Sequence, residues 1–71
     1  MTMVPVSSSN LASVGYDINT QTLRVSFIGG GLYDYHQVPT HHHQGLMSAI
    51  SKGEYLDTYI KKGGYRFTKL R

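Results

Sequence analysis

A triple glycine at positions 29–31 constrains the fold most strongly, because it separates two segments in which apolar and polar residues alternate. Alternation with a period of two is typical of a β-strand that buries one face, and glycine readily adopts the left-handed backbone of a tight turn. The two segments therefore predict a β-hairpin with these glycines in its loop. The apolar positions of its first strand are Leu23, Val25 and Phe27.

The length of the hairpin loop decides which side chains face each other. A two-residue loop at 29–30 would set Asp34 opposite Val25, on the apolar face. A three-residue loop at 29–31 would set Tyr33 opposite Phe27 and would keep the polar residues together. It would also set Tyr35 opposite Val25. We therefore predict the three-residue loop, which places both tyrosines on the side that the core should cover. The polar face then consists of Arg24, Ser26, Asp34 and His36.

Further strands are predicted on either side of the hairpin. Alternation predicts an earlier strand with Ala12, Val14 and Tyr16 on one face, and a turn at residues 17–20 follows it. A final strand is predicted over residues 65–70.

Two helices are predicted between the hairpin and the final strand. Pro39 ends the extended segment and Thr40 can cap the first helix. Residues 51–54 fit the capping box Ser-x-x-Glu, so a second helix should begin there, and Gly63 should end it. The residues expected to be buried are His42 or His43, Leu46, Ala49 and Ile50 in the first helix, and Tyr55, Leu56, Tyr59 and Ile60 in the second.

The predicted order is β-β-β-α-α-β, an α+β domain in which two short helices cover a small antiparallel β-meander. Seventy-one residues suffice for one core, so residues 6–71 are expected to form a single domain after a disordered N-terminal lead over residues 1–5. No apolar run approaches the roughly 18 residues that a membrane span needs, and the N-terminus lacks the features of a signal peptide. We expect a cytoplasmic domain with no membrane partner.

The spacing of the histidines, serines and acidic residues favours neither metal binding nor catalysis. Three consecutive histidines at 41–43 point about 100° apart on a helix and cannot converge on one ion. The serines at 7–9 have no neighbouring base, and the acidic residues leave no carboxylate pair for acid–base chemistry. Asp34 is expected to lie diagonal to Arg24 across the hairpin, in an exposed pair that contributes little. We predict no catalytic site, no metal and no cofactor.

Basic and aromatic residues are interleaved. Seven lysines and arginines against four acidic residues give a formal charge of +3, and six tyrosines supply most of the aromatic side chains. Exposed tyrosines beside such cations would form a stacking platform for unpaired bases. Alternatively, the tyrosines pack in the core or at its rim, and the basic tail is a solvated edge that discourages strand pairing. The residues expected to contact nucleic acid are Arg24, Tyr33, Tyr35, Lys61, Lys62, Tyr65, Arg66 and Lys69.

Several short stretches, taken in order, resemble one known family. They are Val6-Ser-Ser-Ser-Asn-Leu11, Val14-Gly-Tyr-Asp17, Leu23-Arg-Val-Ser-Phe27, Tyr33-Asp34-Tyr35, Val38-Pro39, Leu46 with Ala49, Ser51-Lys-Gly53, and Ile60 followed by Tyr65. In their order and spacing they are similar to the KTSC domain family, which is named for the C-terminal domain of some lysyl-tRNA synthetases and also occurs as a free-standing small protein. The family is characterised by a Tyr-x-Tyr centre, matched here by Tyr33 and Tyr35.

The resemblance implies no established activity, and it suggests RNA binding only through the attachment of the domain to synthetases. Where the family tends to have apolar or aromatic residues, this chain has His42 and His43, which implies looser packing at the start of the helix. We therefore expect a small non-enzymatic binding domain that weakly binds RNA or another single-stranded nucleic acid. The alternative is a module for protein interaction or homodimerisation that uses an unpaired first or last strand.

Overall fold

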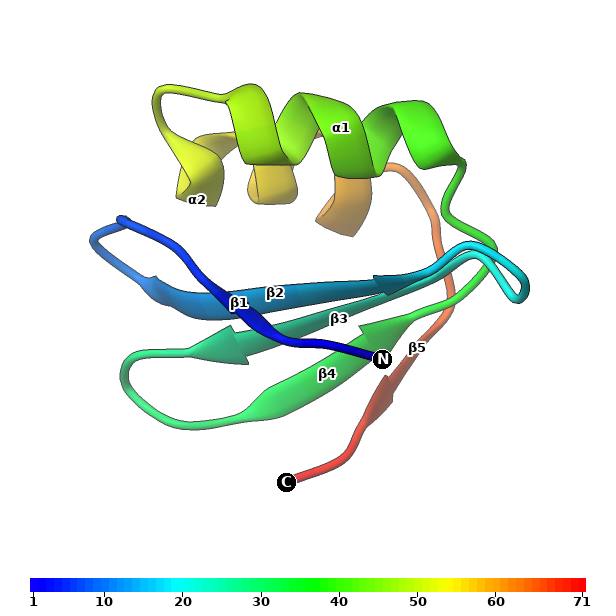
Figure 1. Ribbon diagram of the computed structural model, residues 1–71, viewed down its shortest axis with the longest axis horizontal. Helices are drawn as coiled ribbons and strands as arrows, with labels where there is room; N and C mark the ends of the chain where they lie inside the picture. Colours follow the sequence, from blue (N-terminus) through cyan, green and yellow to red (C-terminus); the bar gives the residue numbers. More distant parts are fainter.

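The computed structural model describes residues 1–71 and contains one antiparallel sheet of five strands in the order β1-β2-β3-β4-β5. Figure 1 shows the helices packed together on one side of this sheet. The predicted α+β class is confirmed, with one additional strand at the N-terminal edge. The elements are β1 (Val4–Pro5), β2 (Leu11–Asp17), β3 (Thr22–Phe27), β4 (Leu32–Tyr35), α1 (Thr40–Ser48), α2 (Lys52–Tyr55), the π-helix η1 (Leu56–Lys61) and β5 (Phe67–Lys69).

The additional strand β1 lies within residues 1–5, which the sequence predicted to be a disordered lead. Val4 pairs with Val14, and Pro5 pairs with Ser13. Proline has no backbone N–H to donate, so it is tolerated in an edge strand of this kind. This segment is therefore attached to β2 as a short edge of the sheet.

The hairpin β3–β4 has a three-residue loop, but the loop spans residues 28–30 rather than 29–31. Val25 consequently faces Tyr33, and the predicted pairing of Tyr33 with Phe27 is wrong by two positions. A shift of two residues preserves which side chains share a face, so both tyrosines lie on the predicted side. The displaced loop places Gly30 and Gly31 at φ values of 106° and 101°, where a side chain would be strained.

A β-bulge changes the predicted face of β2. Leu11 pairs with Phe27 and Ser13 pairs with Ser26, so Ala12 is an extra residue without a partner. The prediction that Ala12 shares a face with Val14 is therefore wrong, and Leu11 takes the core position instead. The predicted turn after β2 is confirmed by a hydrogen bond of 2.9 Å from the Asn19 N–H to an Asp17 carboxylate oxygen.

The first helix begins and ends differently from the prediction. Pro39 occupies the N-cap position and Thr40 is already helical, so the predicted cap by Thr40 is wrong. The helix ends at Ser48 because Ala49 is extended. Ile50 therefore lies beyond the helix and is fully exposed, although it was expected in the core.

The second helix begins as predicted, with the Ser51 hydroxyl accepting a hydrogen bond from the Glu54 N–H. It continues as the wider π-helix η1, which the sequence did not predict. Tyr59 is half exposed as a result, whereas the aliphatic residues of the predicted face are buried. Gly64 rather than Gly63 adopts the left-handed backbone that follows this helix.

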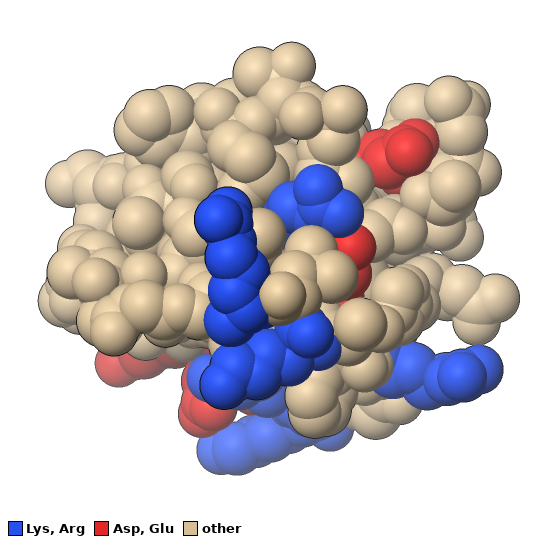
Figure 2. All heavy atoms as spheres, turned by 90° about the horizontal axis from the view of Figure 1, so that it is seen from below, with Lys and Arg blue, Asp and Glu red and all other residues tan.

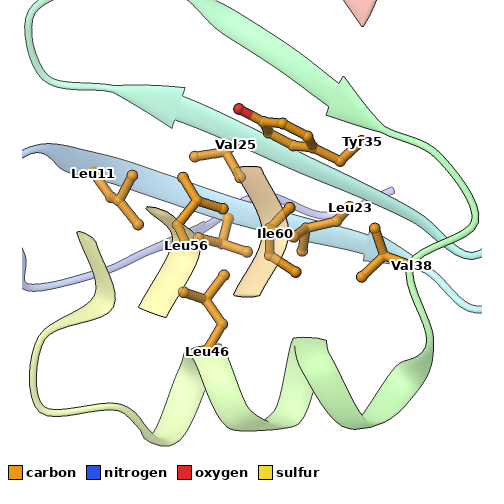
Figure 3. Packing of buried hydrophobic residues seen from close by; sticks show 9 residues of the cluster. Leu11, Leu23, Val25, Tyr35, Val38, Leu46, Leu56 and Ile60 are labelled. Carbon is orange, nitrogen blue, oxygen red and sulfur yellow. The ribbon is translucent and has the colours of Figure 1, made fainter. Parts of the chain in front are cut away.

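The core lies between the helices and the middle of the sheet (Figure 3). Leu46 of α1 and the residues Leu56 and Ile60 of η1 pack against aliphatic side chains of β2 and β3. The Tyr16 hydroxyl donates a 2.6 Å hydrogen bond to the Val38 carbonyl, which fixes the segment before α1. None of the helices has the length and apolarity required to cross a lipid bilayer. The buried apolar residues are Leu11, Val14, Leu23, Val25, Tyr35, Val38, Leu46, Leu56 and Ile60.

Candidate functional site: an aromatic basin

A pocket of about 430 Å³ lies beside β4 and β5, on the side of the sheet that carries the helices. Five of its lining side chains are aromatic, and they come from β3, β4, β5 and the segment before β5. One lysine at the end of η1 completes the lining. We call this pocket the aromatic basin; its residues are Phe27, Gly30, Tyr33, Tyr35, Lys61, Tyr65 and Phe67.

Strand pairing places the rings of the aromatic basin together. Tyr33 and Tyr35 are two residues apart on β4, so both project to the same face, and their rings lie 6.3 Å apart and nearly parallel. Phe67 of β5 pairs with Tyr35, and its ring centroid lies 6.1 Å from that of Tyr35 and 6.0 Å from that of Tyr33. The Phe27 ring meets Tyr33 edge to face at 5.6 Å. These contacts are typical aromatic pairs and fix the shape of the basin.

The rings differ in how much surface they present. Tyr35 is only 4% exposed and belongs to the core, whereas Phe67 is 61% exposed. Tyr33 and Tyr65 are half-buried. Burial raises the pKa of Tyr35, with a further contribution from Tyr33, so its hydroxyl remains protonated at neutral pH. A ligand in the basin would therefore meet mainly the rings of Tyr33, Tyr65 and Phe67.

Two lysine ammonium groups lie against the rings of the basin. Lys61 Nζ is 5.2 Å from the centroid of Phe27, and Lys69 Nζ is 5.9 Å from the centroid of Tyr33. Both distances suit a cation–π interaction. No carboxylate lines the basin. The side chains that line the basin therefore include one positive charge and no negative charge.

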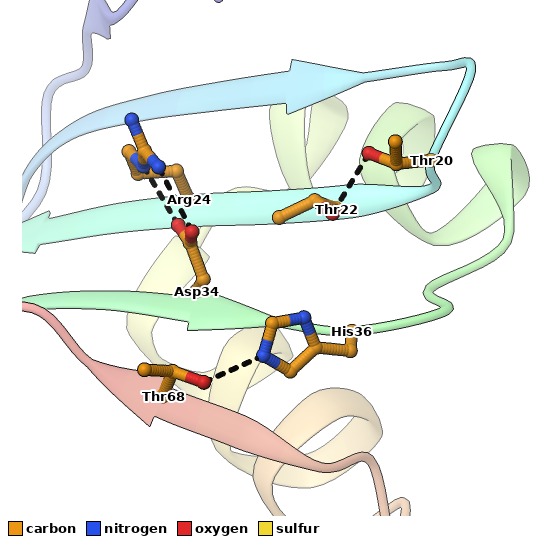
Figure 4. Close-up of polar contacts among 6 residues, drawn as sticks. All are labelled: Thr20, Thr22, Arg24, Asp34, His36 and Thr68. Atoms are coloured by element: carbon orange, nitrogen blue, oxygen red, sulfur yellow. Dashed lines mark hydrogen bonds and ion pairs between the residues drawn. The ribbon is translucent and has the colours of Figure 1, made fainter.

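Arg24 lies elsewhere, on the outer face of the sheet (Figure 4). Its guanidinium donates two hydrogen bonds to Asp34, from Nε at 2.7 Å and from Nη2 at 2.9 Å. The predicted diagonal, exposed pair is wrong, because the shifted loop sets the two residues directly opposite each other and Asp34 is only 8% exposed. The hydrogen bonds to Asp34 raise the pKa of Arg24. This arginine is committed to an ion pair and does not border the basin.

The other basic residues do not line the basin. Lys62 forms an exposed ion pair of 3.4 Å with Asp57, and Arg66 is exposed before β5. Figure 2, which looks onto the outer face of the sheet, shows lysine and arginine side chains gathered on that face. Of the residues expected to contact nucleic acid, the structure brings together Tyr33, Tyr35, Lys61, Tyr65 and Lys69.

Phe27, Gly30 and Phe67 also line the basin, although the sequence did not identify them as site residues. The alternation in β3 assigned Phe27 to the core, and Phe67 was only a member of the last strand. The spacing of two between Phe67 and Lys69 indicated that their side chains share one face of the last strand. It could not indicate that this face lies beside Tyr33 and Tyr35, because that depends on the pairing of β5 with β4. That pairing joins segments separated by two helices.

Comparisons with known proteins identify the family to which the chain belongs. The KTSC domain model matches residues 7–65, so the chain is a member of the KTSC domain family. The crystal structure of a KTSC domain protein from Yersinia pestis has a TM-score of 0.92 and 41% identity, and the match covers 99% of this chain and 97% of that one. The matching model is that of the KTSC domain, and its description names no catalytic activity.

Relatives occur both as small proteins and within larger ones. An uncharacterised protein of Stutzerimonas stutzeri is 39% identical over 70 residues, which are 99% of each chain. A lysine–tRNA ligase of Nostoc punctiforme is 36% identical over 62 residues, and these cover 87% of this chain but 11% of the ligase. The chain thus corresponds to a small part of that ligase and to nearly the whole of the first protein.

Proposed function

We propose that the aromatic basin binds unpaired nucleotides of RNA or of another single-stranded nucleic acid. The observation that supports this function best is the presence of accessible aromatic rings and two lysines at one pocket. Stacking of a base on an aromatic ring contributes about 1–3 kcal/mol, and lysines neutralise the phosphates of the backbone. The similarity to a segment of a lysine–tRNA ligase, a protein named for an RNA substrate, favours RNA among polyanions.

The side-chain charges around the basin disfavour an organic cation as its ligand. Aromatic pockets also bind organic cations through the faces of their rings. Here two ammonium groups already occupy the faces of Phe27 and Tyr33, and no carboxylate lines the basin to attract a further cation. A planar ligand with negative charge is therefore favoured.

The assignment of contact residues changes accordingly. Lys61 and Lys69 would bind phosphate, and Tyr33, Tyr65 and Phe67 would stack on bases. Tyr35 supports the floor of the basin. Lys62 and Arg66 add positive charge from outside the pocket. Arg24 would not contact a ligand in the basin, because it lies on the opposite face of the sheet, where its Nε and Nη2 donate hydrogen bonds to Asp34.

Fluorescence anisotropy of a labelled ten-nucleotide single-stranded RNA, titrated at 50 and 200 mM salt, tests this function. We expect weak binding that falls with salt. Lys61→Gln and Lys69→Gln should each reduce the slope of log K against log salt by about 0.7, the value for one phosphate of a single strand. Lys52→Gln is the matched control, since it changes the net charge equally but lies near residues 7–9, away from the basin.

An absence of binding at 50 mM salt would contradict the function. Equal losses in all three lysine variants would instead show diffuse attraction to the positively charged surface, with no role for the basin. Either result would remove the basin as the nucleic-acid site.

A second candidate function, homodimerisation, is favoured by the outer edge of β5. The Arg66 carbonyl accepts a hydrogen bond from the His36 N–H, and the Leu70 N–H donates one to the Leu32 carbonyl. By alternation the N–H and C=O groups of Phe67 and Lys69 therefore point away from the sheet. Antiparallel pairing with a second copy about Thr68 would satisfy these groups and would set Phe67 opposite the partner's Lys69. This edge is short and carries a lysine, both of which weaken strand addition.

Sedimentation at protein concentrations up to 1 mM (roughly the weak-interaction range) and at high salt tests the dimer. We expect a concentration-dependent dimer that Lys69→Pro abolishes, because proline removes the outward N–H but not a hydrogen bond to β4. A monomer at every concentration, or a dimer that persists in Lys69→Pro, would contradict this arrangement.

A further inference from the structure

The position of the aromatic basin differs from that of the open platforms on which many proteins stack nucleic acid. Such platforms use the exposed face of a sheet, across which two or three successive bases can stack. The rings here lie on the face that the helices cover, and only its β4–β5 end remains accessible. A run of stacked bases extending across this face would collide with α1 and η1.

The lining of the basin contacts a ligand from several elements of the fold and not from one strand alone. Its residues come from the β3–β4 hairpin, from η1, from the segment before β5 and from β5 itself. Its volume of about 430 Å³ falls within the range of about 300–1,000 Å³ that is typical of small-molecule sites. Two other hollows of the molecule lack aromatic side chains: Ile50 is the one hydrophobic residue that lines the first, and no hydrophobic residue lines the second.

The two lysines indicate which chemical groups an aromatic ligand in the basin should carry. Phe27 and Tyr33 are in contact, and each carries one ammonium group at its ring. A flat aromatic ligand would displace the ammonium groups from the rings, and each would then need an anionic partner. A base with a phosphate on one or both sides of its sugar supplies such partners, whereas an uncharged aromatic ligand does not.

Building on the proposed function, we infer that the basin accepts one planar base at a time, inserted with its attached phosphate, and does not bind a stacked run of bases. A free mononucleotide and an extruded nucleotide of a strand share this chemistry. Duplexes are excluded, because their bases are paired and cannot enter a pocket. Phe67, the most exposed ring, would form the outer stacking surface, and Lys61 and Lys69 would bind the flanking phosphates.

Three trinucleotides of equal charge test the inference by anisotropy at low salt. One carries three adenines, one carries a central adenine between two abasic residues, and one is wholly abasic. We expect the single-adenine strand to bind within about threefold of the three-adenine strand, the statistical limit for one site. The wholly abasic strand should bind roughly tenfold more weakly, as the loss of one stacked base predicts.

The variant Phe67→Ala supplies the protein side of the test. It should weaken the single-adenine strand by roughly tenfold and leave the abasic strand unchanged. Tyr59→Ala is the matched control, because it removes a half-exposed aromatic ring outside the basin. Amide chemical shifts of basin residues should respond to adenosine monophosphate but not to inorganic phosphate.

The outcomes separate this inference from the proposed function. Equal affinity for the abasic and adenine strands would overturn base insertion while leaving polyanion binding intact. Binding of the three-adenine strand more than tenfold tighter than the single-adenine strand would overturn the one-base site. Binding of adenosine monophosphate without binding of any strand would support the inference and overturn the proposed function. No response to any of these ligands would overturn both.

Discussion

The side of the sheet that faces the helices has two halves that differ in what covers them. Over β2 and β3, aliphatic side chains such as Leu11 and Val25 are completely buried under α1 and η1. Over β4 and β5, the aromatic side chains continue the same face, but burial decreases from Tyr35 to the mostly exposed Phe67. Strand alternation determines the face of a residue, whereas the extent of the helix layer determines whether that face becomes core or site. Here two short helices cover only one half.

The largest difference between the halves should appear when the helix–sheet contact itself is removed. Leu56 of η1 is completely buried, and Leu56→Ala should lower the free energy of unfolding by about 2–5 kcal/mol through lost burial and the resulting cavity. A domain of this size has about 5–15 kcal/mol in total, so the variant should be substantially destabilised in urea.

Ile50→Ala is the control for this variant. It removes an aliphatic side chain that is fully exposed beyond α1, and it should leave the urea midpoint nearly unchanged. Similar effects of the two substitutions would show that the helices do not protect the β2–β3 half as described.

The faces of the strands were predictable from the sequence, but their exact pairing was not. Alternation identified the side on which Tyr33, Tyr35 and Val25 lie, because a period of two survives a shift of two residues. It could not determine where the glycine loop begins, nor detect the bulge at Ala12, since both depend on hydrogen bonds between strands. The wider turn of η1 was also not predicted, since the sequence indicated a regular helix.

The candidate site was predictable only in part for the same reason. The Tyr-x-Tyr centre and the basic C-terminal segment were visible in the sequence, and β5 does place Lys69 beside Tyr33. The environment of Arg24 was not predicted, because it depends on the one residue that the shifted register sets opposite to it. Phe67 was missed because its neighbours come from strands that precede the helices.

An ion pair on the outer face of the sheet connects the two halves. The Arg24–Asp34 pair joins β3 to β4, one strand from each half, and Asp34 is nearly buried. Asp34→Asn should lower the free energy of unfolding by about 1–2 kcal/mol, less than the loss of a fully buried pair because Arg24 retains partial access to water.

Urea unfolding at neutral pH measures this effect, and a double-mutant cycle with Arg24→Met isolates the interaction of the two side chains. A coupling energy near zero would show that the two hydrogen bonds contribute nothing to the join between β3 and β4. The affinity for RNA should change little, because neither side chain borders the basin.

Protonation of His42 and His43, which lie near the boundary between the two halves, should lower the free energy of unfolding by a smaller amount than these substitutions do. His42 contacts Tyr55 through a 3.1 Å hydrogen bond and lies beside Tyr65 of the basin, while His43 stacks on Tyr16. Burial lowers the pKa of both histidines, and His41 lowers the pKa of His42 further. The folded state therefore favours the neutral rings.

A histidine whose pKa is lowered by folding contributes full stability above its unfolded value of about 6.5 and loses it as the pH falls towards the folded pKa. We expect the urea midpoint to decrease between pH 7.5 and 5, and His43→Gln should reduce this decrease. A midpoint that is constant over this range would indicate that the two histidines are fully solvated in the folded state.

Phe67→Ala should have the smallest effect on folding and the largest effect on binding, so it tests whether the β4–β5 half differs from the buried β2–β3 half. Phe67 is a larger apolar side chain than Leu56, but it is 61% exposed at the rim of the basin. The free energy of unfolding should therefore change by no more than about 0.5 kcal/mol, as is usual for surface substitutions. If urea unfolding instead shows a loss close to that of Leu56→Ala, the Phe67 ring is part of the core, and the β4–β5 half is a continuation of the packed interior with no ring left free for a ligand.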